Sequence, residues 1–192
     1  MSKFISGVGY NSKGRHRATE NNRATTPYYI WCNMIRRCYD PKMQLRQPTY
    51  KGCTVAEEWF DFQAFAEWFC GHEYSGAGYC LDKDLLFAGN KVYSPHTCCF
   101  VPQELNKLLS DRKAARGDLP QGVSYFKRDS NYVAGISINA KKKNLGYFDC
   151  PNEAHQVYKK AKEAYVKEKA LEWQDRIADN VFQALMSWQL TE

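Results

Sequence analysis

Residues 122–161 read GVSYFKRDSNYVAGISINAKKKNLGYFDCPNEAHQVYKKA, and this stretch decides the fold of the C-terminal part of the chain. Apolar and polar residues alternate in three short runs that turn signals separate, which is typical of strands. The predicted strands are Gly122–Asp129, Tyr132–Asn139 and Leu145–Asp149. Turns are predicted at Ser130-Asn131 and over the lysine-rich Ala140–Asn144. The stretch therefore predicts a three-stranded antiparallel sheet.

A helix is predicted to follow the strands and to cover one face of the sheet. Pro151 suits the first helical position, with Asp149 or Cys150 as the cap. The apolar and small residues that recur at helical spacing are Ala154, Val157, Tyr158, Ala161, Ala164 and Tyr165. Cations, hydroxyls and rings remain for the other face of the sheet. A basic and aromatic sheet face with a helix behind it indicates nucleic-acid binding.

The same stretch resembles the plant ethylene-response-factor (APETALA-type) DNA-binding domain, which also occurs in phage and mobile-element endonucleases. The residues that carry the resemblance are Gly122-Val123, Tyr132-Val133-Ala134-Gly135-Ile136, Leu145-Gly146-Tyr147-Phe148 and Glu153-Ala154. The resemblance implies that the sheet enters the major groove and that its exposed face contacts double-stranded DNA. The DNA-binding residues implied by position are Tyr125, Lys127, Arg128, Asn131, Tyr132, Ser137, Asn139, Lys141, Lys142 and Lys143.

These residues indicate whether the sheet would contact DNA phosphates or DNA bases. Arg128 is the one arginine of the predicted sheet, so phosphate contact is better supported than tight base discrimination. The lysine run Lys141–Lys143 has a second interpretation, in which it is only a solvated hairpin tip.

Charge is spread unevenly over the 192 residues, whose net charge is +6. Residues 1–50 carry nine Lys or Arg and two Asp or Glu, whereas residues 51–120 carry seven against ten. We therefore expect cationic groups of the N-terminal part to bind DNA beside a site that could hold a cation. The candidates are Arg15 and Arg17 in the basic arm, residues 1–25, and the pair Arg36 and Arg37.

Eight cysteines occur, without a CxxC pair, a signal peptide or an apolar run of transmembrane length. These observations predict a cytoplasmic protein with no membrane contact and with reduced, mostly buried thiols. A zinc site from Cys32, Cys38, Cys53 and Cys70 is conceivable, but their spacings do not fit a zinc pattern, so zinc is not expected.

The N-terminal half is predicted to be helical. A helix should run from Thr26 to about Tyr39, a loop should cover Asp40–Lys51, and a second helix should lie near Ala56–Cys70 and end at Gly71. The aromatic residues of both helices recur at helical spacing, which favours a hydrophobic core over base stacking.

The central stretch carries the candidate chemistry. A short apolar strand beginning at Tyr79 ends in Asp82 and Asp84, and a loop follows it. Ser94 and Pro95 are predicted to begin a helix that runs through Leu109 and contains Asn106 about three turns in. Carboxylate and amide oxygens suit one Mg²⁺ or Mn²⁺ ion, which stabilises the charge that develops in phosphodiester cleavage.

This segment, residues 79–109, resembles the ββα-metal motif of H-N-H nucleases, especially the divergent form in phage and homing endonucleases. The resemblance implies that Asp82 and Asn106 bind the metal. Lys83 stands where that family places the histidine that activates water, and the neighbouring carboxylates favour its charged form, so Lys83 is expected to stabilise phosphate charge.

Other residues of the segment could complete the site. His96 and Asp84 are the candidate bases, and Asn90 is the candidate substitute for a histidine-orienting asparagine in the loop. The other interpretation of Asp82-Lys83-Asp84 is a solvated charged turn with ion pairs.

Together these features predict an α+β protein that binds double-stranded DNA. The expected organisation is a basic arm (1–25), an H-N-H-like nuclease part (26–118), an ethylene-response-factor-type domain (119–166) and a helical tail (167–192). The expected function is that of a divalent-metal-dependent, homing-type DNA endonuclease of a phage or mobile element. The alternative is a catalytically inactive DNA-binding protein that acts as a regulator or an inhibitor of host machinery. A homodimer would suit palindromic DNA, although nothing in the sequence requires it.

Overall fold

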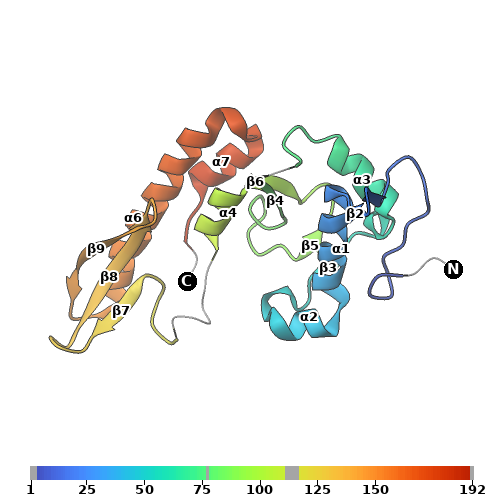
Figure 1. Cartoon of the computed structure of the whole chain (residues 1–192). Coiled ribbons are helices and arrows are strands. Elements are labelled where there is room, and N and C mark those ends of the chain that lie inside the picture. The colour runs from blue at the N-terminus through green and yellow to red at the C-terminus, as the bar shows by residue number, and fades with distance from the viewer. Residues whose placement is uncertain (1–3, 77, 111–116, 191–192) are drawn as a thin grey trace. The chain divides into compact units, whose positions relative to one another are not determined.

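The computed structural model describes residues 4–76, 78–110 and 117–190 and divides the chain into two compact units (Figure 1). Unit 1 comprises Met1–Gln103 with Arg176–Val181, and unit 2 comprises Glu104–Asp175 with Phe182–Glu192. Both units contain helices and strands, so the α+β class predicted from the sequence is confirmed. Within the described residues, no helix combines the length and the apolar composition that a membrane span needs.

Unit 1 is built around two helices, α1 (Thr26–Tyr39) and α3 (Phe62–Cys70). The rings of Trp31 and Phe62 meet between them, with centroids 5.6 Å apart. The indole N–H of Trp31 donates a hydrogen bond to the backbone oxygen of Trp59 at 2.7 Å. These rings and that of Phe65 are fully buried. The prediction that the aromatic residues form a core is therefore confirmed, and α1 has the predicted bounds.

Most of the cysteines also lie inside the fold, as predicted. Five of the eight are buried, and Cys32, Cys38 and Cys53 belong to the core of unit 1. Cys70, by contrast, is exposed at the end of α3. Burial, and then the neighbouring Cys53, raises the pKa of Cys38 to about 12, so this thiol stays protonated at neutral pH.

The segment Asp40–Lys51, predicted as a loop, contains helix α2 (Pro41–Arg46) and the 3-10 helix η1 (Pro48–Tyr50). The carboxylate of Asp40 caps α2 by accepting a hydrogen bond from the backbone N–H of Lys42 at 2.8 Å. The loop prediction was wrong because α2 covers only six residues, too few for a periodic apolar stripe.

The predicted helix Ala56–Cys70 is two elements, the 3-10 helix η2 (Glu57–Phe60) and α3. Asp61 separates them and caps α3, since its Oδ1 accepts a hydrogen bond from the backbone N–H of Gln63 at 3.1 Å. Its Oδ2 accepts a hydrogen bond from the hydroxyl of Ser12 at 2.6 Å. Asp61 therefore also fixes the N-terminal arm to this core.

Short strands complete unit 1. In the N-terminal arm β1 (Thr19–Glu20) and β2 (Arg23–Ala24) form a hairpin, and β3 (Thr54–Val55) pairs in parallel with β5 (Val92–Tyr93). The strands β4 (Tyr79–Asp82) and β6 (Cys99–Pro102) pair in antiparallel register.

The predicted start of a helix at Pro95 was wrong. The hydroxyl of Ser94 accepts a hydrogen bond from the backbone N–H of Thr97 at 3.2 Å, which closes a turn instead of capping a helix. Residues 99–102 are all buried and extend along β4. Helix α4 begins only at Gln103 and ends at Leu109, so Asn106 lies about one turn into it.

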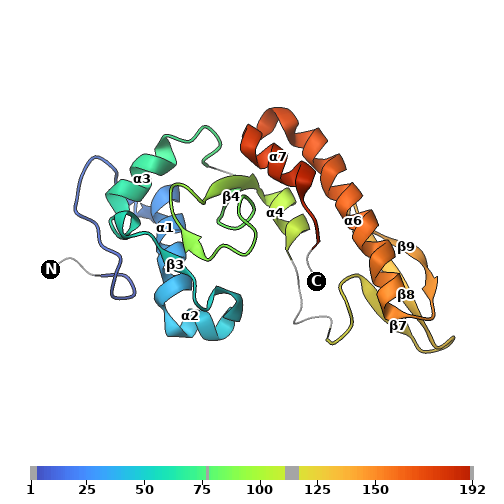
Figure 2. The same cartoon turned by 180° about the vertical axis from the view of Figure 1, so that it is seen from behind.

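Unit 2 contains an antiparallel sheet of β7 (Val123–Phe126), β8 (Asn131–Ile138) and β9 (Lys141–Phe148), with β8 in the centre. Helix α6 (Pro151–Trp173) lies along one face of this sheet (Figures 1 and 2). Ala134 and Ile136 of the sheet are buried in one cluster with Ala154 and Tyr158 of α6. The predicted sheet with a single helix behind it is therefore confirmed, as is Pro151 as the first helical residue.

The lysine run was placed wrongly in the sequence analysis. Lys141–Lys143 begin strand β9, and the turn before them is only Asn139-Ala140. These two residues have φ values of 48° and 60°, which are typical of a tight type I′ hairpin turn. Because two residues suffice to reverse the chain, the lysines pair with Ile138, Ser137 and Ile136 of β8.

The C-terminal helical region is present, although its helices have other bounds. Helix α6 passes without interruption through residue 166, where a domain boundary was predicted, and continues to Trp173. The 3-10 helix η3 (Gln174–Arg176) and helix α7 (Asp179–Ser187) follow. Val181 and Leu185 of α7 are fully buried.

A substitution at Gly122 tests the contact between the sheet and α6. Its φ is +79°, and a Cβ atom there would overlap the ring of Tyr158. Gly122→Ala should lower the free energy of unfolding by at least about 2 kcal/mol, because backbone strain and the overlap add. Urea unfolding followed by circular dichroism measures the change. Gly117→Ala is the matched control, with φ +69° and open space around the new methyl group. Equal losses in both variants would contradict the proposed contact.

Candidate nucleic-acid interface and acidic loop

The register of the sheet determines which side chains point away from α6. Ala134 and Ile136 are buried against the helix, so the alternate residues of β8 point the other way. Directly paired residues of neighbouring strands share a face. We call the side away from α6 the open face, and its residues are Ser124, Phe126, Asn131, Val133, Gly135, Ser137, Lys142, Asn144 and Tyr147. Figures 1 and 2 show no helix of the described part of unit 2 over it.

Two aromatic rings dominate the open face. Phe126 is 37% exposed and Tyr147 is 56% exposed, and their ring centroids lie 6.1 Å apart. They come from the two outer strands, so Asn131 and Val133 of the central strand lie between them in the register. Sequence reasoning did not name either ring as a binding residue. The strict alternation that begins at Val123 was the signal that could have found Phe126.

Arg128 follows β7 and lies against this pair. Its guanidinium is 5.6 Å from the centroid of the Phe126 ring. The Nε and Nη2 atoms donate to the two carboxylate oxygens of Asp129 at 2.9 and 3.2 Å. These hydrogen bonds raise the pKa of Arg128 and orient the guanidinium. A cation and two rings thus form one cluster at the surface.

The lysines divide between the two sides of the sheet. Lys142 pairs with Ser137 and belongs to the open face. Lys141 and Lys143 pair with Ile138 and Ile136, so their side chains start on the side of α6, although all three lysines are exposed. The sequence analysis placed the three lysines on one face. That placement is corrected because side chains alternate along a strand.

The prediction that Tyr125 and Tyr132 lie on the DNA-binding face was also wrong. They pair directly with each other on the side of α6, with ring centroids 5.3 Å apart. Asn139 serves the hairpin turn, since its backbone N–H donates to the hydroxyl of Tyr165 and its Oδ1 accepts from that hydroxyl, both at 3.1 Å. Lys127 is exposed in the turn after β7.

The four arginines predicted in unit 1 have different surroundings. Arg15 pairs with Glu67, whose pKa is lowered by its hydrogen bonds with His16 and with Arg15. The guanidinium of Arg37 lies 5.2 Å from the centroid of the Tyr50 ring. Arg17 and Arg36 are exposed. Arg15 and Arg37 are therefore already held by partners within unit 1.

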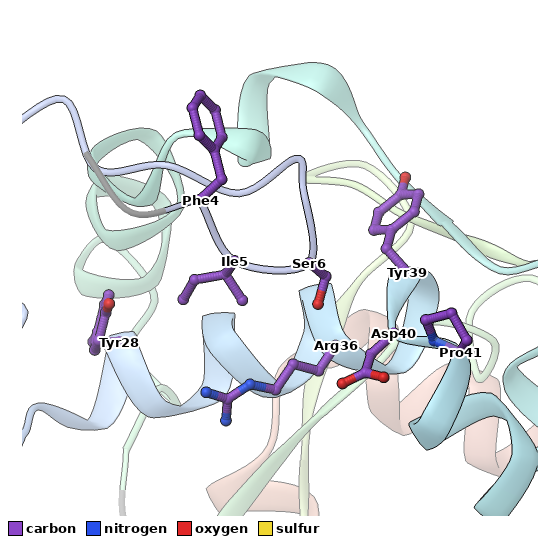
Figure 3. A pocket seen from close by; sticks show the side chains of 8 residues that line it. All are labelled: Phe4, Ile5, Ser6, Tyr28, Arg36, Tyr39, Asp40 and Pro41. Carbon is purple, nitrogen blue, oxygen red and sulfur yellow. The ribbon is translucent and has the colours of Figure 1, made fainter. Parts of the chain in front are cut away.

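Arg36 lines a pocket of about 610 Å³ between the N-terminal segment and α1 (Figure 3). Figure 3 shows the side chain running along α1 with its guanidinium directed toward Tyr28. The pocket is lined by Phe4, Ile5, Ser6, Tyr28, Arg36, Tyr39, Asp40 and Pro41. Asp40 brings a negative charge to the same lining, so the pocket does not present a purely cationic surface.

Asp82 ends β4 and closes a tight turn. Its Oδ1 accepts hydrogen bonds from the backbone N–H groups of Asp84 at 2.9 Å and Leu85 at 2.8 Å. Burial, and then the negative charge of Asp84, raises the pKa of Asp82 above its ordinary value. Two carboxylates therefore lie close together in a partly desolvated loop, and a neighbouring positive charge stabilises their charged forms.

Lys83 supplies that charge. It is 8% exposed, and its Nζ donates to Oδ2 of Asp84 at 2.7 Å and to the backbone oxygen of Asn90 at 3.0 Å. Burial lowers the pKa of Lys83, but the hydrogen bond to Asp84 and the surrounding negative charges outweigh it, so the net shift is upward. The ammonium is therefore charged at neutral pH and cannot accept a proton.

Asn90 holds the same loop through its amide. Its Nδ2 donates to the backbone oxygens of Lys83 at 2.6 Å and Val92 at 2.8 Å. Its Oδ1 accepts from the backbone N–H of Val92 at 3.1 Å. The structure therefore places Asn90 in a network with Lys83 and Asp84, as a residue that shapes the loop.

The remaining predicted residues are His96 and Asn106. His96 is exposed in the turn before β6. Asp82 belongs to unit 1 and Asn106 to unit 2, so the predicted pair of metal ligands does not share a unit. Among the described residues, no group of three or more His, Cys, Asp or Glu side chains is arranged to hold a metal ion. The ammonium of Lys83 pairs with the carboxylate of Asp84 in this loop.

Lys83→Met should destabilise unit 1. The substitution leaves the backbone oxygen of Asn90 without this donor and removes the cation that pairs with Asp84. Asp84 is half exposed, so solvent compensates in part, and we expect a loss of about 1–2 kcal/mol in the free energy of unfolding. Chemical denaturation measures it, with the exposed Lys42→Met as control. A loss no larger than that of Lys42→Met would refute the structural role of Lys83.

Comparisons with known proteins give no match to this chain. No family model, no curated protein and no solved structure matches it. The function must therefore be inferred from the open face in unit 2 and the acidic loop in unit 1.

Proposed function

We propose that this protein binds double-stranded DNA through the open face of the β7–β9 sheet. The observation that supports the proposal best is the composition of that face. Lys142 and, at the other end of the sheet, Arg128 bring positive charge, and Asn131, Ser137 and Asn144 bring polar groups. The net charge of +6 adds attraction for a polyanion. A cytoplasmic location would agree with this function.

The dimensions of the sheet suit the major groove. Neighbouring strands lie about 4.8 Å apart, so the outer strands of a three-stranded sheet are separated by about 10 Å. The major groove of B-form DNA is about 12 Å wide and admits an α-helix or a two-stranded ribbon, so two of the three strands could enter it together. Helix α6 lies on the opposite face, so it does not block such an approach.

The residues of the open face favour phosphate contact over base discrimination. Lys142 can neutralise a phosphate, which adds affinity for every sequence. The side-chain amide of Asn144 can donate to a base edge, whereas its Oδ1 already accepts from the backbone N–H of Gly146 at 2.9 Å and Oδ1 of Asn131 is buried. Arg128 is already bound to Asp129, so it is less available for a bidentate contact with guanine. We therefore expect salt-sensitive binding with modest sequence preference.

The lysine run gives a test of which face binds. Lys142→Ala should flatten the slope of log K against log salt by about 0.9, because one phosphate contact is lost. Lys143→Ala removes the same charge from the next residue, whose side chain starts on the side of α6, and should change the slope less. The exposed Lys160→Ala on α6 is the distant control. Fluorescence anisotropy with a short duplex gives the constants. Equal slopes for all three variants would count against the open face.

A second candidate function is DNA cleavage by a divalent-metal-dependent endonuclease. The observation in its favour is the order strand, strand, helix in β4, β6 and α4, with Asp82 at the end of the first strand. In this candidate Asp82 and Asn106 would bind Mg²⁺ or Mn²⁺, which would supply charge stabilisation at the scissile phosphate. Lys83 favours the rival, a DNA-binding protein that does not cut, because it already neutralises the acidic loop.

Incubation with supercoiled plasmid separates these two candidates. An endonuclease should relax the plasmid with Mg²⁺ or Mn²⁺ and not with EDTA, and Asp82→Asn should abolish the activity. Asp118→Asn, at an exposed position outside the loop, is the control. A plasmid that stays supercoiled with every metal, under conditions in which binding is measured, would eliminate the cleavage candidate and leave DNA binding.

A further inference from the structure

The two rings of the open face have no evident partner in a DNA groove. Phe126 and Tyr147 present large apolar surfaces to water, with ring centroids 6.1 Å apart and an interplanar angle of 61°. The bases of an intact duplex expose only their edges in the grooves, since their faces are stacked on one another. Ring faces bind base faces only where bases are unstacked.

We infer that Phe126 and Tyr147 form a stacking platform for unpaired bases, so that the preferred ligand is DNA with a single-stranded segment. This inference rests on the proposed function, because it assumes that the open face binds DNA. Stacking on aromatic side chains tolerates any sequence, because every base has a π face. This platform therefore agrees with a face that is poor in base-reading arginines.

The groups around the rings complement a single strand of DNA. Arg128 lies on one side of the pair, 5.6 Å from the centroid of the Phe126 ring, and can add a cation–π contact to a stacked base. Lys142 lies on the same face, level with Ser137, which is four residues along β8 from the pairing partner of Tyr147, and can neutralise a phosphate farther along the strand. Rings for bases beside cations for phosphates are the combination that proteins use to bind single strands.

Asn131 adds a hydrogen-bonding group beside the platform. It pairs with Phe126 in the register, and its Oδ1 is buried without a hydrogen-bond partner among the described residues. Buried acceptors of this kind are normally satisfied. This oxygen is enclosed by protein atoms, so the exocyclic amino group of an unpaired base could donate to it only if the Asn131 side chain turned outward. The open face would then contact a base by its face and by its edge.

The test compares three labelled ligands: a single-stranded oligonucleotide, a blunt duplex, and the same duplex with a single-stranded overhang. Wild-type protein should bind the overhang duplex more tightly than the blunt duplex at equal salt. Phe126→Leu and Tyr147→Leu keep an apolar side chain and remove the π system. Each should weaken overhang binding by about tenfold, which equals about 1.4 kcal/mol, and leave blunt-duplex binding within about twofold.

Tyr125→Leu is the matched control, because this tyrosine is 47% exposed but lies on the side of α6. Circular dichroism confirms that each variant is folded, which is expected because the replaced rings are exposed. Equal affinity for blunt and overhang DNA, or equal losses on both ligands in the Leu variants, would overturn the platform while the proposed function stands. Failure of the wild type to bind any of the three ligands would refute the proposed function itself.

Discussion

The packing of α6 against Ala134 and Ile136 is the constraint on which the candidate interface depends. Side chains alternate along a strand, so burying these two positions assigns every other residue of the sheet to a face. Gly122 permits the close approach of Tyr158 that this packing requires. The open face is therefore the side of the sheet that does not take part in the hydrophobic core. Its cations and rings are exposed because the apolar residues of the same strands are covered.

In unit 1, the pairing of opposite charges constrains the acidic loop. Asp82 and Asp84 lie in one partly desolvated loop, and the ammonium of Lys83 pairs with Asp84. A lysine ammonium therefore already occupies the carboxylate next to the predicted metal ligand. This is the physical reason to rank DNA binding above DNA cleavage, although the order of β4, β6 and α4 keeps cleavage as a candidate.

Helices and strands were predicted correctly where the sequence itself contains a start signal or a regular spacing of apolar residues. Helix α1 and the beginning of α6 at Pro151 follow from proline and apolar spacing, and the three strands follow from alternation. The strand β6 was missed because Ser94-Pro95 is a helix-start signal, whereas residues 99–102 are held by pairing with β4, which sequence spacing does not show. The same reason explains the lysine run. Which lysine points away from α6 depends on a two-residue turn, and a shift of one residue exchanges the faces.

The candidate site was predictable in outline and not in detail. The alternation located a basic and aromatic sheet face, but Phe126 and Tyr147 were identified only once the register had been fixed.

The central claim, that the open face binds DNA, is tested most directly by following backbone and side-chain amide resonances while duplex DNA is added. The account predicts shifts concentrated in β7, β8 and β9, including the side-chain amides of Asn131 and Asn144, with α6 unaffected on its outer side. Shifts confined to α1, α3 or the outer side of α6, with the sheet unchanged, would contradict it.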